Sequence, residues 1–167
     1  MKKHKAKKHA KKNKGFSLIE LLIVVAIILI IAAIAIPNLL RSRIAANEAS
    51  AVGSERTLNT SEITYNSTYG QFACTLGAMG GSGSGTATSS AAGLIDANLA
   101  LGTKSGYTFA LGSDCTTTQY ETSANPVTAG VTGQRNFCSD LSGVIQQQAS
   151  GTAPSTVTAC EALNSPI

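Results

Sequence analysis

Sixteen consecutive residues, 21–36, carry no polar atom in any side chain, and this run limits what the chain can fold into. The wider stretch of residues 16–40 is interrupted only by Ser17, Glu20, Pro37 and Asn38. About 20 apolar residues are enough for a helix to cross the hydrocarbon core of a bilayer. The sequence therefore predicts a membrane-embedded helix over residues 16–40.

Charge is distributed unevenly along the 167 residues. Eight of the 13 lysines and arginines, and both histidines, lie in residues 1–15, whereas the rest has five basic residues against nine acidic ones. A basic flank stays on the cytoplasmic side of a membrane, so the residues after Arg43 are expected on the other side. We expect no nucleic-acid partner, because the remainder offers no basic surface.

Loss of residues 1–15 would leave a chain without histidine. That excludes Ser-His-Asp and Cys-His nucleophile systems and any histidine-ligated metal. The chain also has no paired carboxylates at a recognisable spacing. We therefore expect a protein that is not an enzyme and uses no cofactor.

Three fates of the apolar segment are open. A conventional signal peptide would be cut after the A-x-A-like triplet at residues 33–35, and a plain anchor would stay uncut. In the third scheme a leader is removed and the apolar helix is kept. Glu20 favours the third, because a carboxylate within a membrane span costs about 2.5 to 3.5 kcal/mol on insertion scales and is usually paired and functional.

Residues 15–28 read GFSLIELLIVVAII, and residues 32–37 read AAIAIP. This pattern resembles the amino-terminal signature of type IV pilins and of the pseudopilins of type II secretion systems. The resemblance implies that a prepilin peptidase cuts between Gly15 and Phe16 and methylates the new amine of Phe16. It also implies that the precursor lies in the lipid of the bacterial inner membrane. Pilus or type II secretion assembly machinery then builds it, with other copies, into a homopolymeric filament outside the membrane.

The residues around this cleavage point have physical roles of their own. The freed amine of Phe16 would be positively charged at neutral pH, and Glu20, one helical turn away, can neutralise it in the same or a neighbouring subunit. We expect this pair to set the axial register during assembly. Gly15, which has no Cβ, lets a peptidase approach the backbone closely. Pro37 predicts a kink, the alternative being that the helix ends there.

A helical stripe continues past Pro37, which favours one helix from residue 16 to about Tyr69, capped by Gly70. Its apolar members are Leu40, Ile44, Ala51, Leu58, Tyr65, Tyr69 and Phe72. We expect the aromatic members to pack in a core, and fraying or a bend near Gly53 and residues 57–61. The charged neighbours, expected on a face turned to water, are Glu48, Glu55, Arg56 and Glu62.

Beyond the helix the pattern changes to a period of two, which predicts an antiparallel meander. The expected strand runs are residues 107–111, 120–127, 134–138 and 144–147. Residues 80–93, rich in glycine and serine, have the composition of a flexible surface loop. The fold class is α+β and pilin-like, with a long amino-terminal helix, half membrane-embedded and half packed on a small sheet. The expected divisions are the leader 1–15, the filament-core helix 16–40, the exposed half-helix 41–72 and the sheet domain 73–167.

The four cysteines lie on the expected extracytoplasmic side, where disulfides persist. They are Cys74, Cys115, Cys138 and Cys160. Three connectivities are open. We favour Cys74–Cys115, which would clamp the Gly/Ser region, and Cys138–Cys160, which would clamp the carboxyl tail. The cysteine spacings contain no C-x-x-C pair, which disfavours a zinc site. Asp114 and Asp140 are expected in solvated turns rather than in a calcium site.

The predicted function is that of a structural subunit of a type IV pilus or pilus-like filament. A pseudopilin of a type II secretion system is the alternative, because the amino-terminal signature is shared. The second alternative is a secreted binding protein that begins at Ile36 after removal of a conventional signal peptide.

Overall fold

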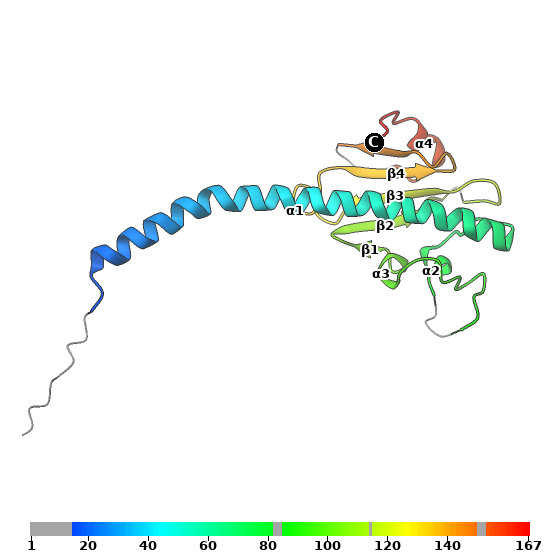
Figure 1. The fold of residues 1–167 in the computed structure, drawn as a ribbon. Helices are drawn as coiled ribbons and strands as arrows, with labels where there is room; N and C mark the ends of the chain where they lie inside the picture. The colour runs from blue at the N-terminus through cyan, green and yellow to red at the C-terminus, as the bar shows by residue number, and fades with distance from the viewer. Residues whose placement is uncertain (1–14, 82–84, 114, 150–152) are drawn as a thin grey trace, which may run out of the picture. The chain divides into compact units, whose positions relative to one another are not determined.

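The computed structural model describes residues 15–81, 85–113, 115–149 and 153–167. The chain divides into two compact units, Met1–Asn38 and Leu39–Ile167, which we describe separately. Helix α1 (Leu18–Tyr69) contributes to both (Figure 1). The expectations for the leader before Gly15 and for Asp114 lie outside the described residues.

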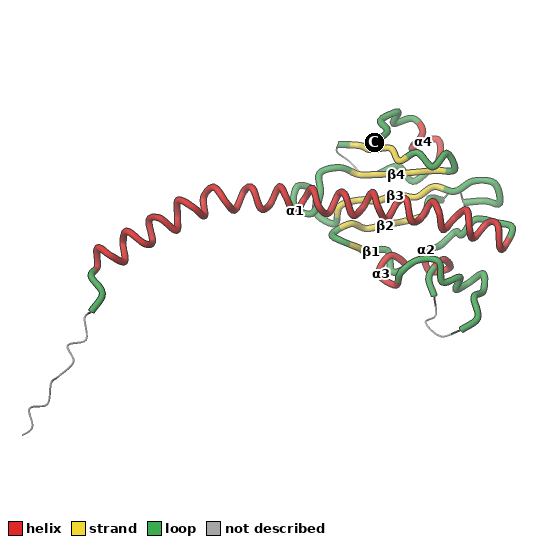
Figure 2. Tube along the Cα trace, in the orientation of Figure 1, coloured by secondary structure: helices red, strands yellow, loops and turns green. Residues whose placement is uncertain are grey.

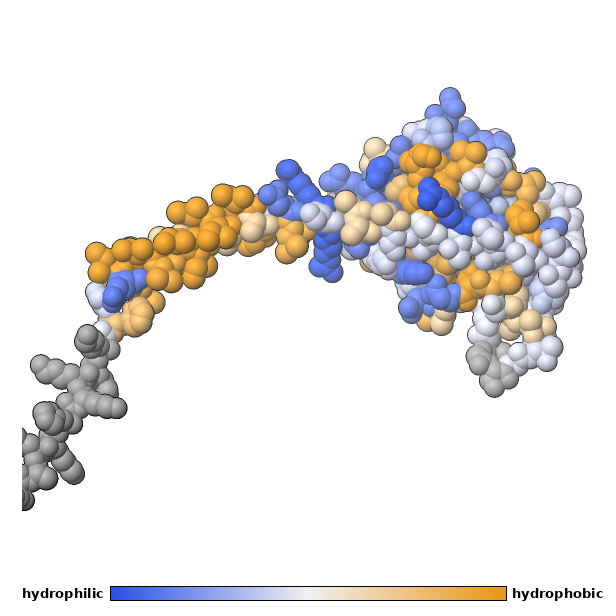
Figure 3. All heavy atoms as spheres, in the orientation of Figure 1, coloured by the Kyte–Doolittle hydropathy of each residue, from blue (hydrophilic) through white to orange (hydrophobic). Residues whose placement is uncertain are grey.

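In the first unit, the described part consists mainly of the apolar beginning of α1. From residue 15 to residue 38 every side chain is exposed except that of Ala32, which is half-buried. The large apolar side chains appear as the orange stretch of Figure 3. In the described part of the chain, α1 is the one helix long and apolar enough to cross a membrane. A helix that is apolar all round needs cover from lipid or from other helices.

Helix α1 continues through Pro37 and Gly53 and ends at Tyr69. The predicted resumption of the helix is confirmed, and an end at Pro37 is wrong; a kink there stays a prediction. The expected fraying is also wrong, since the helix is continuous across Gly53 and residues 57–61. The alternative of a bend there stays a prediction. Gly70 has a φ of 73° and its N–H donates to the Asn66 carbonyl at 2.8 Å, as expected of a glycine cap.

The second unit contains one antiparallel sheet of five strands in the order β1-β2-β3-β4-β5, which confirms the predicted meander. The strands are β1 (Thr103–Lys104), β2 (Tyr107–Leu111), β3 (Glu121–Pro126), β4 (Asn136–Asp140) and β5 (Ile145–Gln148). Residues 39–69 of α1 lie across one face of the sheet (Figures 1 and 2).

Three short helices complete this unit. They are α2 (Leu76–Met79), α3 (Ala97–Ala100) and α4 (Val157–Glu161). These helices and β1 were not predicted, because a helix of four or five residues covers little more than one turn and a strand of two residues shows no alternation.

The core lies between α1 and the sheet. From the predicted stripe, Ala51, Leu58 and Tyr65 are at most 2% exposed, and they meet Tyr107 and Phe109, which alternate inward along β2. The predicted core role of the aromatic stripe members is confirmed by two ring contacts. Tyr65 lies 4.7 Å from Tyr69, and Phe72 lies 4.8 Å from Tyr120, between ring centroids.

The structure corrects the position of three acidic residues. Glu48, Glu55 and Glu62, which we call the acid seam, were expected to face water, but they are 6%, 0% and 0% exposed. Their spacing of seven residues puts them on one helical face, between the apolar residues that also recur every seven. Arg56 is exposed as expected.

The two deeper members of the seam each accept one hydrogen bond from outside α1. Glu55 accepts from the hydroxyl of Thr122 on β3, and Glu62 accepts from the backbone N–H of Ala73 at 2.8 Å. Burial raises the pKa of Glu55 to about 8, against the hydrogen bond from Thr122 and with help from the nearby charge of Glu121. Burial likewise raises the pKa of Glu62 to about 7, against its bond from Ala73.

Two disulfides cross-link the second unit, and the one between Cys138 and Cys160 is fully buried. Cys74 is bonded to Cys115 with 5.5 Å between Cα atoms, and Cys138 to Cys160 with 6.0 Å. These are the pairs favoured from the sequence. The first ties the segment after α1 to the connection between β2 and β3, and the second holds α4 against β4.

Residues 85–90 of the Gly/Ser segment are exposed, as expected of a surface loop, and hydrogen bonds hold its described parts. The N–H of Gly93 donates to the Gly80 carbonyl at 2.9 Å, and the Tyr65 hydroxyl donates to the Ser89 carbonyl. A Cβ at Gly80 would lie 2.6 Å from the Cβ of Ala100, so the close approach to α3 requires glycine.

Asp140 is also corrected. It ends β4 and opens the expected turn, in which the Gly143 N–H donates to its carbonyl at 2.9 Å. The residue is only 3% exposed, however, and its carboxylate accepts from the N–H of Ser142 at 2.8 Å. It serves the turn from within the fold rather than from solvent.

The acid seam predicts a pH-dependent stability. Because the pKa of Glu55 is raised on folding, its contribution is complete below about pH 4.5 and is lost as the pH rises through about 8. Glu55→Gln keeps an acceptor for Thr122 but no longer titrates. We expect the free energy of unfolding of the wild type to fall between about pH 5 and pH 8 by at least about 1 kcal/mol more than that of Glu55→Gln.

The measurement is guanidinium unfolding of the full chain in mild detergent, followed by circular dichroism across this pH range. Glu161→Gln, at an exposed glutamate, is the matched control and should keep the wild-type pH dependence. Parallel pH profiles for the wild type and Glu55→Gln would contradict the prediction.

Removing a disulfide should lower stability at all pH values. The bonds join residues separated by 22 and 41 positions. In the chain-entropy model, replacing both cysteines of either pair by serine should cost about 3 to 4 kcal/mol, slightly more for Cys74–Cys115. Guanidinium unfolding with and without reductant measures this, and a midpoint that reductant leaves unchanged would refute it.

Candidate functional site

The beginning of α1 is capped by Glu20. The backbone N–H of Ser17 donates to Glu20 Oε2 at 2.9 Å, and the N–H of Leu21 donates to the Ser17 carbonyl at 3.2 Å. Serine followed three residues later by glutamate, at a helix that begins at Leu18, is the capping-box pattern. The sequence analysis missed this role, although the S-x-x-E spacing before an apolar run was the signal for it.

The carboxylate of Glu20 has no cationic partner among the described residues. The side chain is exposed. A carboxylate in the first turn interacts favourably with the helix dipole, but this effect alone does not neutralise its charge. In an apolar environment such a group requires a cation.

The bond between Gly15 and Phe16 is accessible. Both residues precede α1 in irregular backbone, and Phe16 is 82% exposed. A Cβ built at Gly15 meets no atom within 4 Å, and Gly15 is not among the residues with positive φ. The described residues therefore impose no requirement for glycine at this position.

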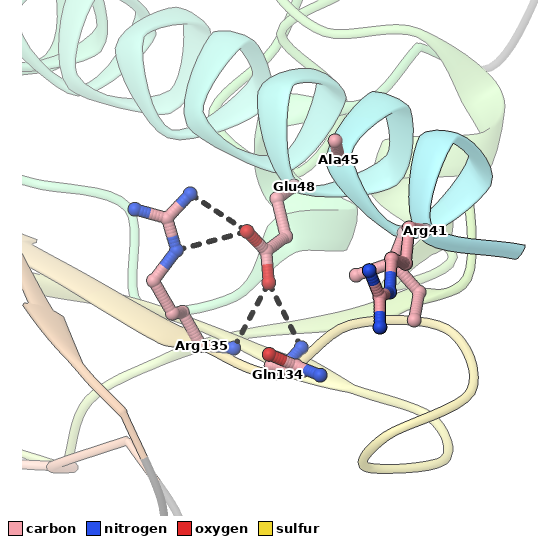
Figure 4. Close-up of a pocket in the computed structure, with 6 residues that line it drawn as sticks. Arg41, Ala45, Glu48, Gln134 and Arg135 are labelled. Carbon is pink, nitrogen blue, oxygen red and sulfur yellow. Dashed lines mark hydrogen bonds and ion pairs between the residues drawn. The ribbon is translucent and has the colours of Figure 1, made fainter. Parts of the chain in front are cut away.

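A second cluster of charges lies in the second unit, around Glu48. Its Oε1 accepts from the backbone N–H groups of Gln134 at 2.8 Å and Arg135 at 3.1 Å. Its Oε2 accepts from Nε of Arg135 at 2.8 Å and lies 2.7 Å from Nη2 (Figure 4). Burial acts to raise the pKa of Glu48, but these hydrogen bonds and the guanidinium outweigh it and lower the pKa.

Metal and nucleophile chemistry finds little support in the described residues. No group of three histidine, cysteine, aspartate or glutamate side chains is placed there to hold a metal ion. The four cysteines are bonded in pairs, so none offers a thiolate.

The comparisons concern the segment that carries Gly15, Phe16 and Glu20. The family model described as the prokaryotic N-terminal methylation motif matches residues 10–36. Over 35 residues the chain is 69% identical to the type IV wide pilus major component PilA4 of Thermus thermophilus. This stretch is 21% of the present chain and 27% of that protein, so the match spans about a quarter of the relative. The amino-terminal segment therefore carries the prokaryotic N-terminal methylation motif and is similar, over this stretch, to a type IV pilus component.

Proposed function

We propose that this chain is the structural subunit of a type IV pilus or pilus-like filament, cut between Gly15 and Phe16 and polymerised through α1. The observation that carries the proposal is the methylation motif joined to an apolar helix exposed on all sides. The subunit is anchored in the bacterial inner membrane before assembly and belongs to a surface filament afterwards.

The exposed apolar helix supports polymerisation, because its surface must be covered in both states. Lipid covers it in the precursor, and equivalent helices of neighbouring subunits replace the lipid in the filament. Contacts between different faces of successive subunits produce an open helical array when the rotation does not close a ring. The assembly machinery transfers the helix from one environment to the other.

Glu20 serves two purposes in this proposal. It caps its own helix through the N–H of Ser17, and it neutralises the amine of Phe16 in its own or a neighbouring subunit after cleavage. Leaving one member of a buried ion pair without its partner typically costs about 3 to 5 kcal/mol, so subunits in the wrong axial register are disfavoured.

The proposed role of Gly15 in peptidase recognition is supported because the described residues give no structural reason for glycine at this position. Neither its packing nor its backbone conformation requires glycine in the described chain. Close approach of an enzyme to the backbone is a reason for glycine that lies outside the fold.

A pseudopilin of a type II secretion system is the second candidate, because the same motif occurs in that class. Long surface fibres made of this chain would favour the pilus. Loss of protein secretion without fibres, after deletion of the chain, would favour the pseudopilin.

The mature amino terminus tests the processing step. Mass spectrometry of the chain isolated from native membranes or fibres should find a polypeptide that begins at methylated Phe16. A chain that begins at Ile36 would support a signal peptidase and contradict the proposal. Gly15→Val should accumulate as uncut precursor without loss of folding, because a side chain at this position meets no neighbour within 4 Å.

Two variants of Glu20 separate capping from charge. Glu20→Gln keeps an oxygen that accepts from Ser17 but has no charge, whereas Glu20→Ala loses both. If neutralisation of Phe16 is the essential role, both variants should insert normally and reduce the yield of filaments at least about tenfold, measured by electron microscopy of sheared fibres. Normal filament yield from Glu20→Gln would leave capping as the only role and refute the ion pair.

A further inference from the structure

The second unit contains an open pocket beside the Glu48–Arg135 ion pair. Its volume is about 260 Å³, and α1 and the segment before β4 form its walls (Figure 4). The lining residues are Arg41, Ile44, Ala45, Glu48, Gln134 and Arg135.

The charges of this pocket are not balanced. Both oxygens of Glu48 are occupied by Arg135 and Gln134, and Nη1 of Arg135 donates to Oε1 of Gln147 at 2.8 Å. The guanidinium of Arg41, in contrast, forms no hydrogen bond or ion pair with any residue of the described chain. The pocket therefore presents one guanidinium without a counter-ion, next to the apolar side chains of Ile44 and Ala45.

The position of Arg41 in the sequence limits where its counter-ion can come from. Arg41 is the fifth residue after Ile36, where the apolar run ends. Five residues of α1 cover about 7.5 Å along the helix axis. The headgroup region is roughly 5 to 8 Å thick on each side of the hydrocarbon core, so Arg41 is within reach of the phosphates of the leaflet it has crossed.

The sign of the charge is unusual for this side of the membrane. Basic residues favour the cytoplasmic side, yet Arg41 and Arg43 follow the span on the opposite side. Arginine is the residue best suited to hold phosphate, because its planar guanidinium donates two parallel hydrogen bonds.

We propose that the Arg41 pocket binds the phosphate of an anionic phospholipid of the extracytoplasmic leaflet while the subunit waits in the membrane. Arg41 donates to the phosphate oxygens, and the exposed Leu39 and Leu40, which precede it on α1, lie on the side of the first carbons of the acyl chains. These apolar side chains distinguish a lipid from free phosphate. This inference rests on the proposed membrane anchoring of the precursor.

Native mass spectrometry of the full chain in mild detergent tests the site, with phosphatidylglycerol and phosphatidylcholine added separately. The wild type should retain phosphatidylglycerol in preference to phosphatidylcholine. Arg41→Gln should lower phosphatidylglycerol retention about fivefold, equivalent to about 1 kcal/mol for one basic residue at an anionic surface. Arg43→Gln is the matched control, since Arg43 is exposed and lies outside the pocket lining, and it should retain the lipid.

Several results would overturn the inference. Equal retention by Arg41→Gln and Arg43→Gln would show that the pocket does not select the lipid. Displacement of phosphatidylglycerol by equimolar inorganic phosphate would show a site for free anions. Filament loss in Arg41→Gln with unchanged lipid retention would show that Arg41 acts in assembly and not in lipid binding.

The same spectra separate this inference from the function on which it rests. Chains that begin at Phe16 but show no lipid preference refute the lipid site alone. Chains that begin at Ile36 refute the proposed function.

Discussion

An apolar helix that is exposed on every side is the constraint from which the rest of this protein follows. Burial of apolar surface is worth about 25 cal/mol per Å², so the first half of α1 is unstable in water and must lie in lipid or among other helices. The second half of α1 instead packs one face against the sheet and leaves its other face exposed. One helix meets both demands by changing its pattern of side chains after Pro37.

The acid seam shows how the second pattern fixes the position of the sheet along the helix. A purely apolar seam with a repeat of seven would pack almost as well after a shift of two turns. Each glutamate instead has its own partner on a different segment: Glu48 on the connection into β4, Glu55 on β3 and Glu62 on the segment after α1. A shifted helix would leave three carboxylates buried without these partners, which is costly. We therefore infer that the main role of the acid seam is to fix the position of the sheet along α1, rather than to add net stability.

Sequence reasoning succeeded where a period extended over many residues. The apolar run, the helix to Tyr69 and the alternation of Tyr107 and Phe109 were predictable for this reason. The acid seam was not, because hydropathy alone places glutamate outside, although its spacing of seven matched that of the buried stripe. The capping box at Ser17 and Glu20 was overlooked because Glu20 was interpreted only as a charge for assembly. The pocket at Arg41 depends on Gln134 and Arg135, which are more than 90 residues away in sequence and share no motif with it.

The acid seam and the two disulfides both hold elements of the second unit together, but only the acid seam depends on pH. The raised pKa values of Glu55, about 8, and Glu62, about 7, make the folded state lose stability as the pH rises through these values. The lowered pKa of Glu48 has the opposite effect, since the stability that its ion pair contributes is lost as the pH falls through that lowered pKa. The carboxylates together favour an intermediate pH range, whereas the disulfides hold the same elements without dependence on protonation. Disulfides persist in oxidising surroundings, so there they hold the fold at pH values at which the seam is weakened.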